Sequence, residues 1–257
     1  MGYWTEKEAM AKKAAEHTAL MEKEKAEAIA ASAAGTIVFG GKDPFPQTDP
    51  RSFGDTVFAV TSDDCVTAIL REGAKGDGNL AALNFASYKT PGGMFMDGSS
   101  AQEEALCHES FLYNVLRQHW SYYDWNRANM NRALYLDRAL WSPDIEFARE
   151  PYPAVSCAVI TCAAPNFRAA SRYRLVSREE NSRALRSRIR FIKDIAERTN
   201  TDVLIAGAYG CGVFGQDPKE VADLFGQVFR HSSVKKVIFA ITPGRNLDIF
   251  TSVFGEK

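Results

Sequence analysis

The segment that decides the fold class runs from Leu80 to Glu109 and reads LAALNFASYKTPGGMFMDGSSAQEEALCHE. Its first six residues are apolar apart from Asn84 and predict a buried strand. Pro91-Gly92-Gly93 then predicts a turn, and the residues from Ala101 onward predict a helix. A strand, a glycine turn and a helix in this order are typical of α/β proteins.

The rest of the chain repeats this alternation of short apolar runs and helical stretches. Further strands are predicted at Thr56–Val60, Ala133–Leu136, Val155–Cys162, Val203–Ala208 and Lys236–Ile241. Helices are predicted at Asp64–Glu72, Ala101–His119, Glu179–Arg198, Pro218–Phe229 and Leu247–Phe254. The alternation predicts an α/β fold with a mixed or mostly parallel sheet covered on both faces. Residues 1–257 show no internal repeat and are expected to form a single domain.

The first 55 residues differ in character from the rest. An alanine-, lysine- and glutamate-rich helix is predicted from Thr5 to about Ser32, so that residues 1–35 form an N-terminal helical extension lying across a surface. Residues 36–55, with Gly40-Gly41 and three prolines, are expected to be irregular.

Charge and cysteine content limit the class of function. The 31 basic and 32 acidic residues nearly cancel, so no direct DNA binding is expected and an anionic ligand must be held locally. The five cysteines, Cys65, Cys107, Cys157, Cys162 and Cys211, lack metal-ligand spacing and predict a reducing compartment. With no apolar leader and no run of 18 apolar residues, we expect a cytoplasmic protein, or a nucleocytoplasmic one if the source is eukaryotic, without membrane contact.

Ligands of open α/β sheets bind beyond the carboxyl ends of the strands. Three strand ends carry polar or glycine-rich residues: 84–87 with the Pro91-Gly92-Gly93 turn, 163–166, and 207–215. We expect these three segments to lie side by side.

The loop from Gly210 to Gly215 matches G-x-G-x-x-G, which favours a dinucleotide site at first sight. It lies late in the chain, however, and no acidic residue ends the next strand to bind a ribose, so redox chemistry with a nicotinamide cofactor is disfavoured. Closely spaced glycines still let backbone N–H groups approach a diphosphate. Phe214 fits either a sugar or base contact, or a core position that closes the loop.

The helix after the glycine turn begins with Gln102, Glu103 and Glu104, and Ser99 or Ser100 is its expected N-cap. Successive helical positions point about 100° apart, so the two glutamates are not expected to present the same face, and at least one should reach the ligand. The alternative is that they only complement the helix dipole. Beside a diphosphate, such a carboxyl is suited to general acid catalysis near neutral pH.

These motifs together resemble a known family. The run Leu83–Ser87, the Pro91-Gly92-Gly93 turn and the Gln-Glu-Glu triplet resemble the signature of the poly(ADP-ribose) glycohydrolases. Ser142-Pro143-Asp144, Ala164-Pro165-Asn166 and the 207–215 loop are similar to the microbial-type branch. The resemblance covers about residues 5–255 and implies a macrodomain, a three-layer α/β/α sandwich with a mixed sheet.

The resemblance also implies an activity: hydrolysis of the ribose–ribose O-glycosidic bond of poly(ADP-ribose), releasing ADP-ribose without a metal or other cofactor. The implied partners are poly(ADP-ribose) or an ADP-ribosylated protein, with ADP-ribose as the product ligand. It implies that Glu104 protonates the leaving oxygen and then activates water, and that Glu103 holds ribose hydroxyls. The residues implied to arrange or bind the substrate are Asn84, Ser87, Gly92, Gly93, Gln102, Gly210, Cys211, Gly212, Val213, Phe214 and Gly215.

Met94 departs from the family signature, because it stands where the third glycine of a triplet is usual. Its side chain either narrows the cleft or turns outward. Retained catalysis is expected, since Glu103 and Glu104 keep their register. The alternatives are a catalytically weak ADP-ribose-binding domain and a hydrolase of mono-ADP-ribosyl linkages.

Four other features have both a functional and a structural interpretation. His108 is either a proton relay or a packed helix residue, and the thiols of Cys107 and Cys211 are not assigned a nucleophilic role. The aromatic cluster Trp120, Tyr122, Tyr123 and Trp125 is a polymer contact or, as we expect, a buried edge. The arginines 183, 186, 188 and 190 are expected on a solvated helix face, where they could meet a polyanion.

Overall fold

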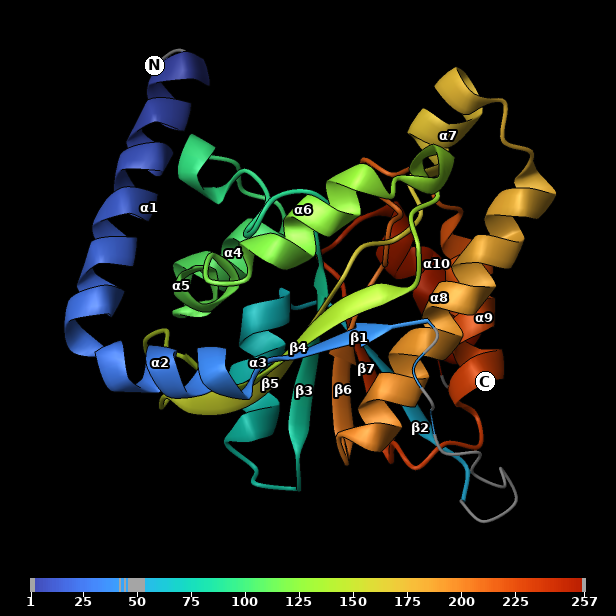
Figure 1. Ribbon diagram of the computed structural model, residues 1–257. Coiled ribbons are helices and arrows are strands. Elements are labelled where there is room, and N and C mark those ends of the chain that lie inside the picture. Colours follow the sequence, from blue (N-terminus) through green and yellow to red (C-terminus); the bar gives the residue numbers. More distant parts are fainter. Residues whose placement is uncertain (1–2, 42, 44, 46–53, 256–257) are drawn as a thin grey trace.

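The structure is a computed structural model that describes residues 3–41, 43, 45 and 54–255. Seven strands form one mixed sheet in the order β1-β4-β5-β3-β6-β7-β2 (Figure 1). The five strands from β5 to β2 are parallel, and β4 runs antiparallel to both of its neighbours. The strands are β1 (Ile37–Gly40), β2 (Val57–Thr61), β3 (Leu80–Phe85), β4 (Arg138–Phe147), β5 (Val155–Cys162), β6 (Val203–Ala206) and β7 (Lys236–Ala240).

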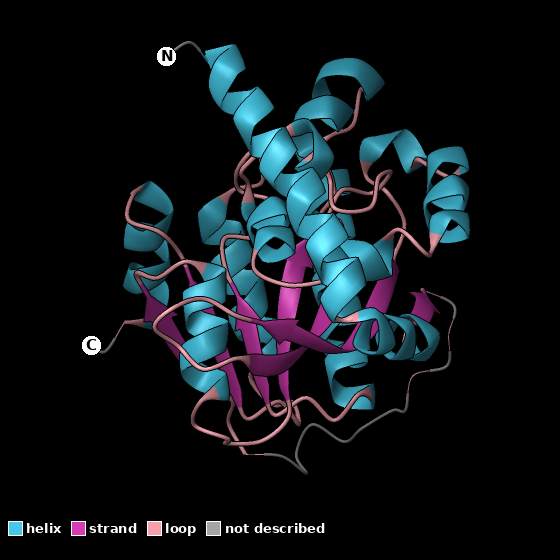
Figure 2. Cartoon of the chain, turned by 90° about the vertical axis from the view of Figure 1, so that its left-hand side faces the viewer, coloured by secondary structure: helices cyan, strands magenta, loops and turns pink. Residues whose placement is uncertain are grey.

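Helices cover both faces of the sheet. One layer contains α3 (Cys65–Gly73), α4 (Gln102–His108), α5 (Leu112–Leu116) and α6 (Trp120–Ala128), with α1 (Tyr3–Glu24) and α2 (Ala26–Gly35) outside them. The other contains α8 (Arg178–Arg198), α9 (Pro218–Phe229) and α10 (Arg245–Phe254), and α7 (Phe167–Arg174) lies at one end (Figure 1). Figure 2 shows α1 crossing in front of its layer. The predicted three-layer sandwich with an N-terminal helical extension is confirmed.

The apolar strands supply both layers with a core. In β3, Ala82 packs toward the layer of α3, whereas Ala81 and Leu83 pack toward the layer of α8. In β6, Ile205 packs toward the layer of α3 and Leu204 packs toward the layer of α8. Strands buried on both faces carry apolar residues at successive positions, which is why their sequences show no two-residue alternation.

The N-terminal prediction was wrong in two details. The long helix is two helices, α1 and α2, which meet at Lys25. Within 36–55, a segment predicted to be irregular, Ile37–Gly40 forms β1 and pairs antiparallel with β4. Four residues are too few for periodicity to reveal, and it is the edge of β4 that makes them a strand. Residues 42, 44 and 46–53 of that segment lie outside the described part of the chain.

The strand predicted at Ala133–Leu136 was also wrong. Ala133 and Tyr135 have positive φ angles of 68° and 60°, and the strand begins only at Arg138. The sequence did not indicate β4, because Pro143 and Asp144, which are unfavourable in strands, lie in its middle. The register shifts between Ser142 and Ile145, and this bulge accommodates both residues.

The helix predicted at Ala101–His119 is divided into α4 and α5 by Ser110. The Ser110 hydroxyl donates to the Leu106 carbonyl at 2.7 Å and accepts the Leu112 N–H at 3.1 Å, which ends one helix and starts the next. The aromatic segment that follows forms a helix of its own, α6.

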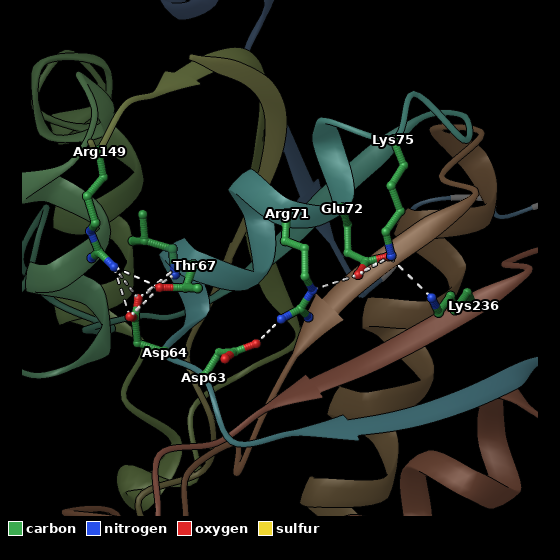
Figure 3. A network of polar contacts seen from close by, with 9 residues as sticks. Asp63, Asp64, Thr67, Arg71, Glu72, Lys75, Arg149 and Lys236 are labelled. Carbon is green, nitrogen blue, oxygen red and sulfur yellow. Dashed lines mark hydrogen bonds and ion pairs between the residues drawn. The ribbon is translucent and has the colours of Figure 1, made fainter. Parts of the chain in front are cut away.

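Polar contacts fix both ends of α3 (Figure 3). At its start, Asp64 caps the helix and accepts from Arg149 Nη1 at 2.8 Å. At its end, Glu72 accepts from Lys75 at 2.8 Å, from Arg71 at 3.1 Å and from Lys236 of β7 at 3.2 Å. Burial opposes the charged form of Glu72, but these donors lower its pKa to about 2. The helix is thereby held against β7, and Cys65 in its first turn lies 3.4 Å from the side-chain amide of Gln102 on α4.

The prediction that four arginines of α8 lie on a solvated face was wrong for Arg188, which is buried. Its side chain is 1% exposed, and its guanidinium donates to Asp137 at 2.7 Å and to the carbonyl of Ala163. Burial alone would lower its pKa, but the nearby anionic groups, Asp137 among them, raise it, so the group is a buried cation bound to the end of β5.

We predict that Arg188→Met destabilises the protein by about 3–5 kcal/mol, because it leaves Asp137 and the Ala163 carbonyl without their donor. Urea unfolding measures the change. Arg190→Met, an exposed position on the same helix, is the matched control and should change stability by less than about 0.5 kcal/mol. Equal effects of the two substitutions would contradict this assignment.

Candidate active site

A cavity of about 710 Å³ lies at the carboxyl ends of the parallel strands. Its lining comes from 85–90, 93–94, 99, 101–104, 135, 164, 166, 208, 210 and 212–214. The three strand ends predicted to lie side by side therefore do so, and they meet the start of α4.

Gln102 fastens α4 to the end of β3. Its carbonyl oxygen accepts the Phe85 N–H at 2.8 Å, and its amide donates to the Leu83 carbonyl at 3.0 Å. The same amide lies 3.4 Å from the Cys65 sulfur on α3. Gln102 lines the cavity, and its polar atoms are engaged with backbone, so it positions the two glutamates that follow.

Glu103 lines the cavity, is buried and is bound on both oxygens. Oε2 accepts the Ser87 N–H at 2.7 Å, and Oε1 accepts from Asn84 Nδ2 at 3.2 Å. Asn84 is fully buried and does not line the cavity, so it contacts Glu103 rather than the cavity. Burial raises the pKa of Glu103 to about 8, although the hydrogen bonds from Ser87 and Asn84 favour the charged form.

Glu104 has one oxygen fixed and one free. Oε1 accepts the Met94 N–H at 2.9 Å. Oε2 is buried and has no hydrogen-bond partner among the described residues, and the side chain lines the cavity. A buried carboxyl oxygen without a partner is costly and is a feature of functional sites. This arrangement goes beyond complementing a helix dipole.

The expectation that the two glutamates present different faces was wrong, because both line the cavity. The glycine turn folds back over the start of α4, so that Gly93 lies against the side chains of both glutamates and the cavity contacts two successive helix residues. A Cβ on Gly93 would lie 2.7 Å from Glu104 Oε1 and 2.8 Å from Glu103 Oε2. The N-cap prediction was wrong as well: Ala101 is the N-cap, with no side-chain hydrogen bond.

Met94 lies at the rim of the cavity. Its φ of −111° is open to any residue, and its side chain is 50% exposed at the cavity rim. The group that holds Glu104 is the backbone N–H of Met94, which a side chain leaves unchanged. Gly92 lies outside the lining and packs on Tyr113.

The loop from Gly210 to Gly215 forms the opposite wall. Gly210 needs its positive φ of 73°, and a Cβ there would meet Ala164 at 2.8 Å, whereas Gly212 has no atom within 4 Å of that position among the described residues. Gly210, Gly212, Val213 and Phe214 line the cavity, but Cys211 and Gly215 line a separate hollow behind the loop. Burial raises the pKa of Cys211 to about 12, which leaves the thiol protonated.

Two tyrosines of the cavity were missed by sequence reasoning. Tyr88 and Tyr135 stack with ring centroids 4.2 Å apart, and Tyr135 meets Phe214 edge to face at 6.1 Å. Tyr135 reaches the cavity through its positive φ, which no periodic pattern indicates. The Ser87 hydroxyl contacts backbone groups of its own loop. It accepts the Lys89 and Thr90 N–H groups at 3.3 and 3.2 Å and so shapes the turn.

The other candidates lie away from the cavity. His108 packs edge to face on Phe95 at 4.6 Å, and burial lowers its pKa. In the aromatic cluster, Tyr122 and Tyr123 are buried, whereas Trp120 and Trp125 are 46% and 40% exposed, which corrects the expectation of a wholly buried edge. Within the described residues no three His, Cys, Asp or Glu side chains are placed to bind a metal, and none of the helices is both long and apolar enough to cross a bilayer.

The pKa of Glu103 predicts a dependence of stability on pH. The folded state holds this proton more tightly than the unfolded chain, whose pKa is near 4.5, so the free energy of unfolding should fall as pH rises from about 4.5 to about 8. The slope due to this group is at most about 1.4 kcal/mol per pH unit. Urea unfolding of wild type and Glu103→Gln across this range measures it, and identical pH slopes would contradict a protonated Glu103.

Comparisons with known proteins place this site in context. Residues 6–150 match the family described as the microbial-type PARG catalytic domain, PARG being poly(ADP-ribose) glycohydrolase. The chain is 28% identical to PARG from Thermomonospora curvata, with a TM-score of 0.86 over 96% of this chain and 100% of that one. The structure of that enzyme bound to the inhibitor ADP-HPD is also 28% identical in sequence, with a TM-score of 0.82 over 95% of this chain and 99% of that one.

PARG from Deinococcus radiodurans in complex with ADP-ribose is 32% identical, with a TM-score of 0.75 over 87% of this chain and 96% of that one. No curated protein gives a significant match.

Proposed function

This chain belongs to the microbial-type poly(ADP-ribose) glycohydrolase family, and we propose that it hydrolyses ribose–ribose O-glycosidic bonds of poly(ADP-ribose) and releases ADP-ribose. The observation that carries the proposal is Glu104, a buried carboxyl held on one oxygen by the Met94 N–H and unpartnered on the other inside a cavity large enough for a nucleotide.

In the proposed reaction, the Glu104 carboxyl gives its proton to the ribose oxygen that leaves. The bond between that oxygen and the anomeric carbon breaks, and positive charge develops on the sugar. Water then adds to the anomeric carbon, and the Glu104 carboxylate takes the proton that this water loses. One bond is hydrolysed, and the carboxyl returns to its starting form.

The other cavity residues hold the substrate during this reaction. Glu103, fixed by Ser87 and Asn84, accepts hydrogen bonds from ribose hydroxyls beside the scissile bond. The diphosphate lies along the loop at Gly212, where no side chain covers the backbone, and its charge supports the developing positive charge. Phe214 and Tyr135 form an edge-to-face pair that packs against the sugar or base.

The test compares two substrates and the product as a binding ligand. Wild-type protein is incubated with labelled poly(ADP-ribose), with a mono-ADP-ribosylated protein and with free ADP-ribose. Release of ADP-ribose from the polymer supports the proposal. Release only from the mono-modified protein would assign the site to the other linkage, and tight ADP-ribose binding without any hydrolysis would make the protein a binding domain.

A further inference from the structure

A second hollow, of about 480 Å³, lies behind the glycine loop. It is distinct from the cavity that holds Glu104. The residues that line it are Phe167, Arg168, Arg178, Asn181, Ser182, Cys211, Gly215, Gln216, Asp217, Pro218, Glu220, Arg245 and Asn246. They come from the end of the glycine loop and from the starts of α7, α8, α9 and α10, which lie together on one side of the molecule (Figure 1).

The glycine loop is the wall between the two spaces. Gly212 and Phe214 line the cavity, and Cys211 and Gly215 line the hollow. Arg168 is joined to this wall directly, because its N–H donates to the Phe214 carbonyl at 3.0 Å. A ligand in the hollow is therefore one loop away from the diphosphate of a ligand in the cavity.

The floor of the hollow is rigid. Asn181 and Gln216 are each 3% exposed and bind one another reciprocally, with hydrogen bonds of 2.8 and 2.9 Å. Gln216 also donates to the Pro165 carbonyl at 2.6 Å. A fixed polar floor keeps the space open and leaves the charged side chains at its rim to meet a ligand.

The rim is positively charged. Arg168, Arg178 and Arg245 line the hollow, and none of them has an ion-pair partner within the described part of the chain. The facing acids are Asp217, which accepts the Lys219 and Glu220 N–H groups at 2.8 and 3.1 Å as the cap of α9, and Glu220. Three guanidinium groups thus exceed two carboxylates, in a chain whose net charge is −1.

We propose that this hollow binds a diphosphate group of poly(ADP-ribose) that belongs to a unit other than the one being cleaved. The inference rests on the proposed function. Every ADP-ribose unit carries a diphosphate, so a polymer with one unit in the cavity brings a second diphosphate by covalent linkage. Arginine forks recognise phosphate oxygens in bidentate fashion. The hollow then adds affinity for the polymer without adding affinity for ADP-ribose itself.

The test uses the double substitution Arg178→Gln with Arg245→Gln, made in a Glu104→Gln background so that the polymer stays intact. The control carries Arg190→Gln with Arg198→Gln, which removes the same charge from exposed positions on α8 outside the hollow. Binding of labelled long poly(ADP-ribose), ADP-ribose and inorganic diphosphate is measured over a series of salt concentrations.

The hollow variant, with Arg178 and Arg245 replaced, should bind long polymer about tenfold more weakly. The slope of log affinity against log salt concentration should become shallower by about 0.7 for each lost charge, the value for a single-stranded polyanion. Its affinity for ADP-ribose and the behaviour of the control should be unchanged. Equal polymer binding by the hollow variant and the control would overturn the proposal. Loss of diphosphate binding alone, with unchanged polymer binding, would overturn it too, since the hollow would then serve a small anion.

A failure of the proposed function is seen separately, as wild-type protein that leaves the polymer intact. The binding comparison does not depend on that result, because it is made with a variant that does not need to cleave.

Discussion

Glu104→Gln should lower kcat for release of ADP-ribose from poly(ADP-ribose) by about 10²–10⁴-fold, the usual contribution of a positioned general acid and base. An amide keeps the size of the side chain and can still accept the Met94 N–H, which is 2.9 Å from Oε1 in the wild type. It has no acidic proton to give to the leaving oxygen. The substitution therefore removes the chemistry and preserves the shape of the site.

ADP-ribose affinity is the control for this variant. Because Glu104 acts on the bond being broken and the product lacks that bond, the Kd for ADP-ribose should change by less than about threefold. Glu104→Gln with wild-type turnover would remove this residue from its role. A parallel loss of ADP-ribose binding would show instead that the side chain mainly shapes the pocket.

Gly93→Ala should lower kcat by roughly 10²-fold or more while leaving the fold intact. The new Cβ would lie within 2.8 Å of a carboxylate oxygen of both Glu103 and Glu104, at a φ of +61° that L residues rarely adopt. The turn must move or the two carboxyls must leave their positions. Either movement displaces the general acid from the leaving oxygen.

Met94→Ala, one residue later, is the matched control. Its backbone has an ordinary φ of −111°, and the N–H that binds Glu104 remains. We expect its kcat within about threefold of wild type and a thermal midpoint close to that of the parent. Steady-state kinetics and thermal unfolding of both variants are the measurements, and a Gly93→Ala enzyme as active as Met94→Ala would refute the role of the turn.

Sequence reasoning was most successful where buried parallel strands and long amphipathic helices dominate. Strands β3 and β5 and helix α9 have the predicted boundaries, because continuous apolar runs and a cap such as Asp217 before Pro218 are local signals. Strand β4 was missed, since its pairing with β1 and its bulge around Pro143 are decided by tertiary contacts.

The site shows the same division. The three segments at the strand ends were predicted from the fold rule alone, and they line one cavity. The burial of Glu103, the free oxygen of Glu104 and the position of Tyr135 depend on how a turn and a left-handed backbone fold back over the strand ends. Residue spacing does not indicate that geometry, so these features could be seen only in the structure.

The most direct test of the central claim is the rate at which ADP-ribose appears from purified poly(ADP-ribose), followed by chromatography for wild type and Glu104→Gln under identical conditions. The account predicts steady release by wild type and release lower by about 10²-fold or more in the variant, with ADP-ribose binding retained by both. Intact polymer in the presence of active, ADP-ribose-binding wild-type protein, or equal release by the two proteins, would contradict it.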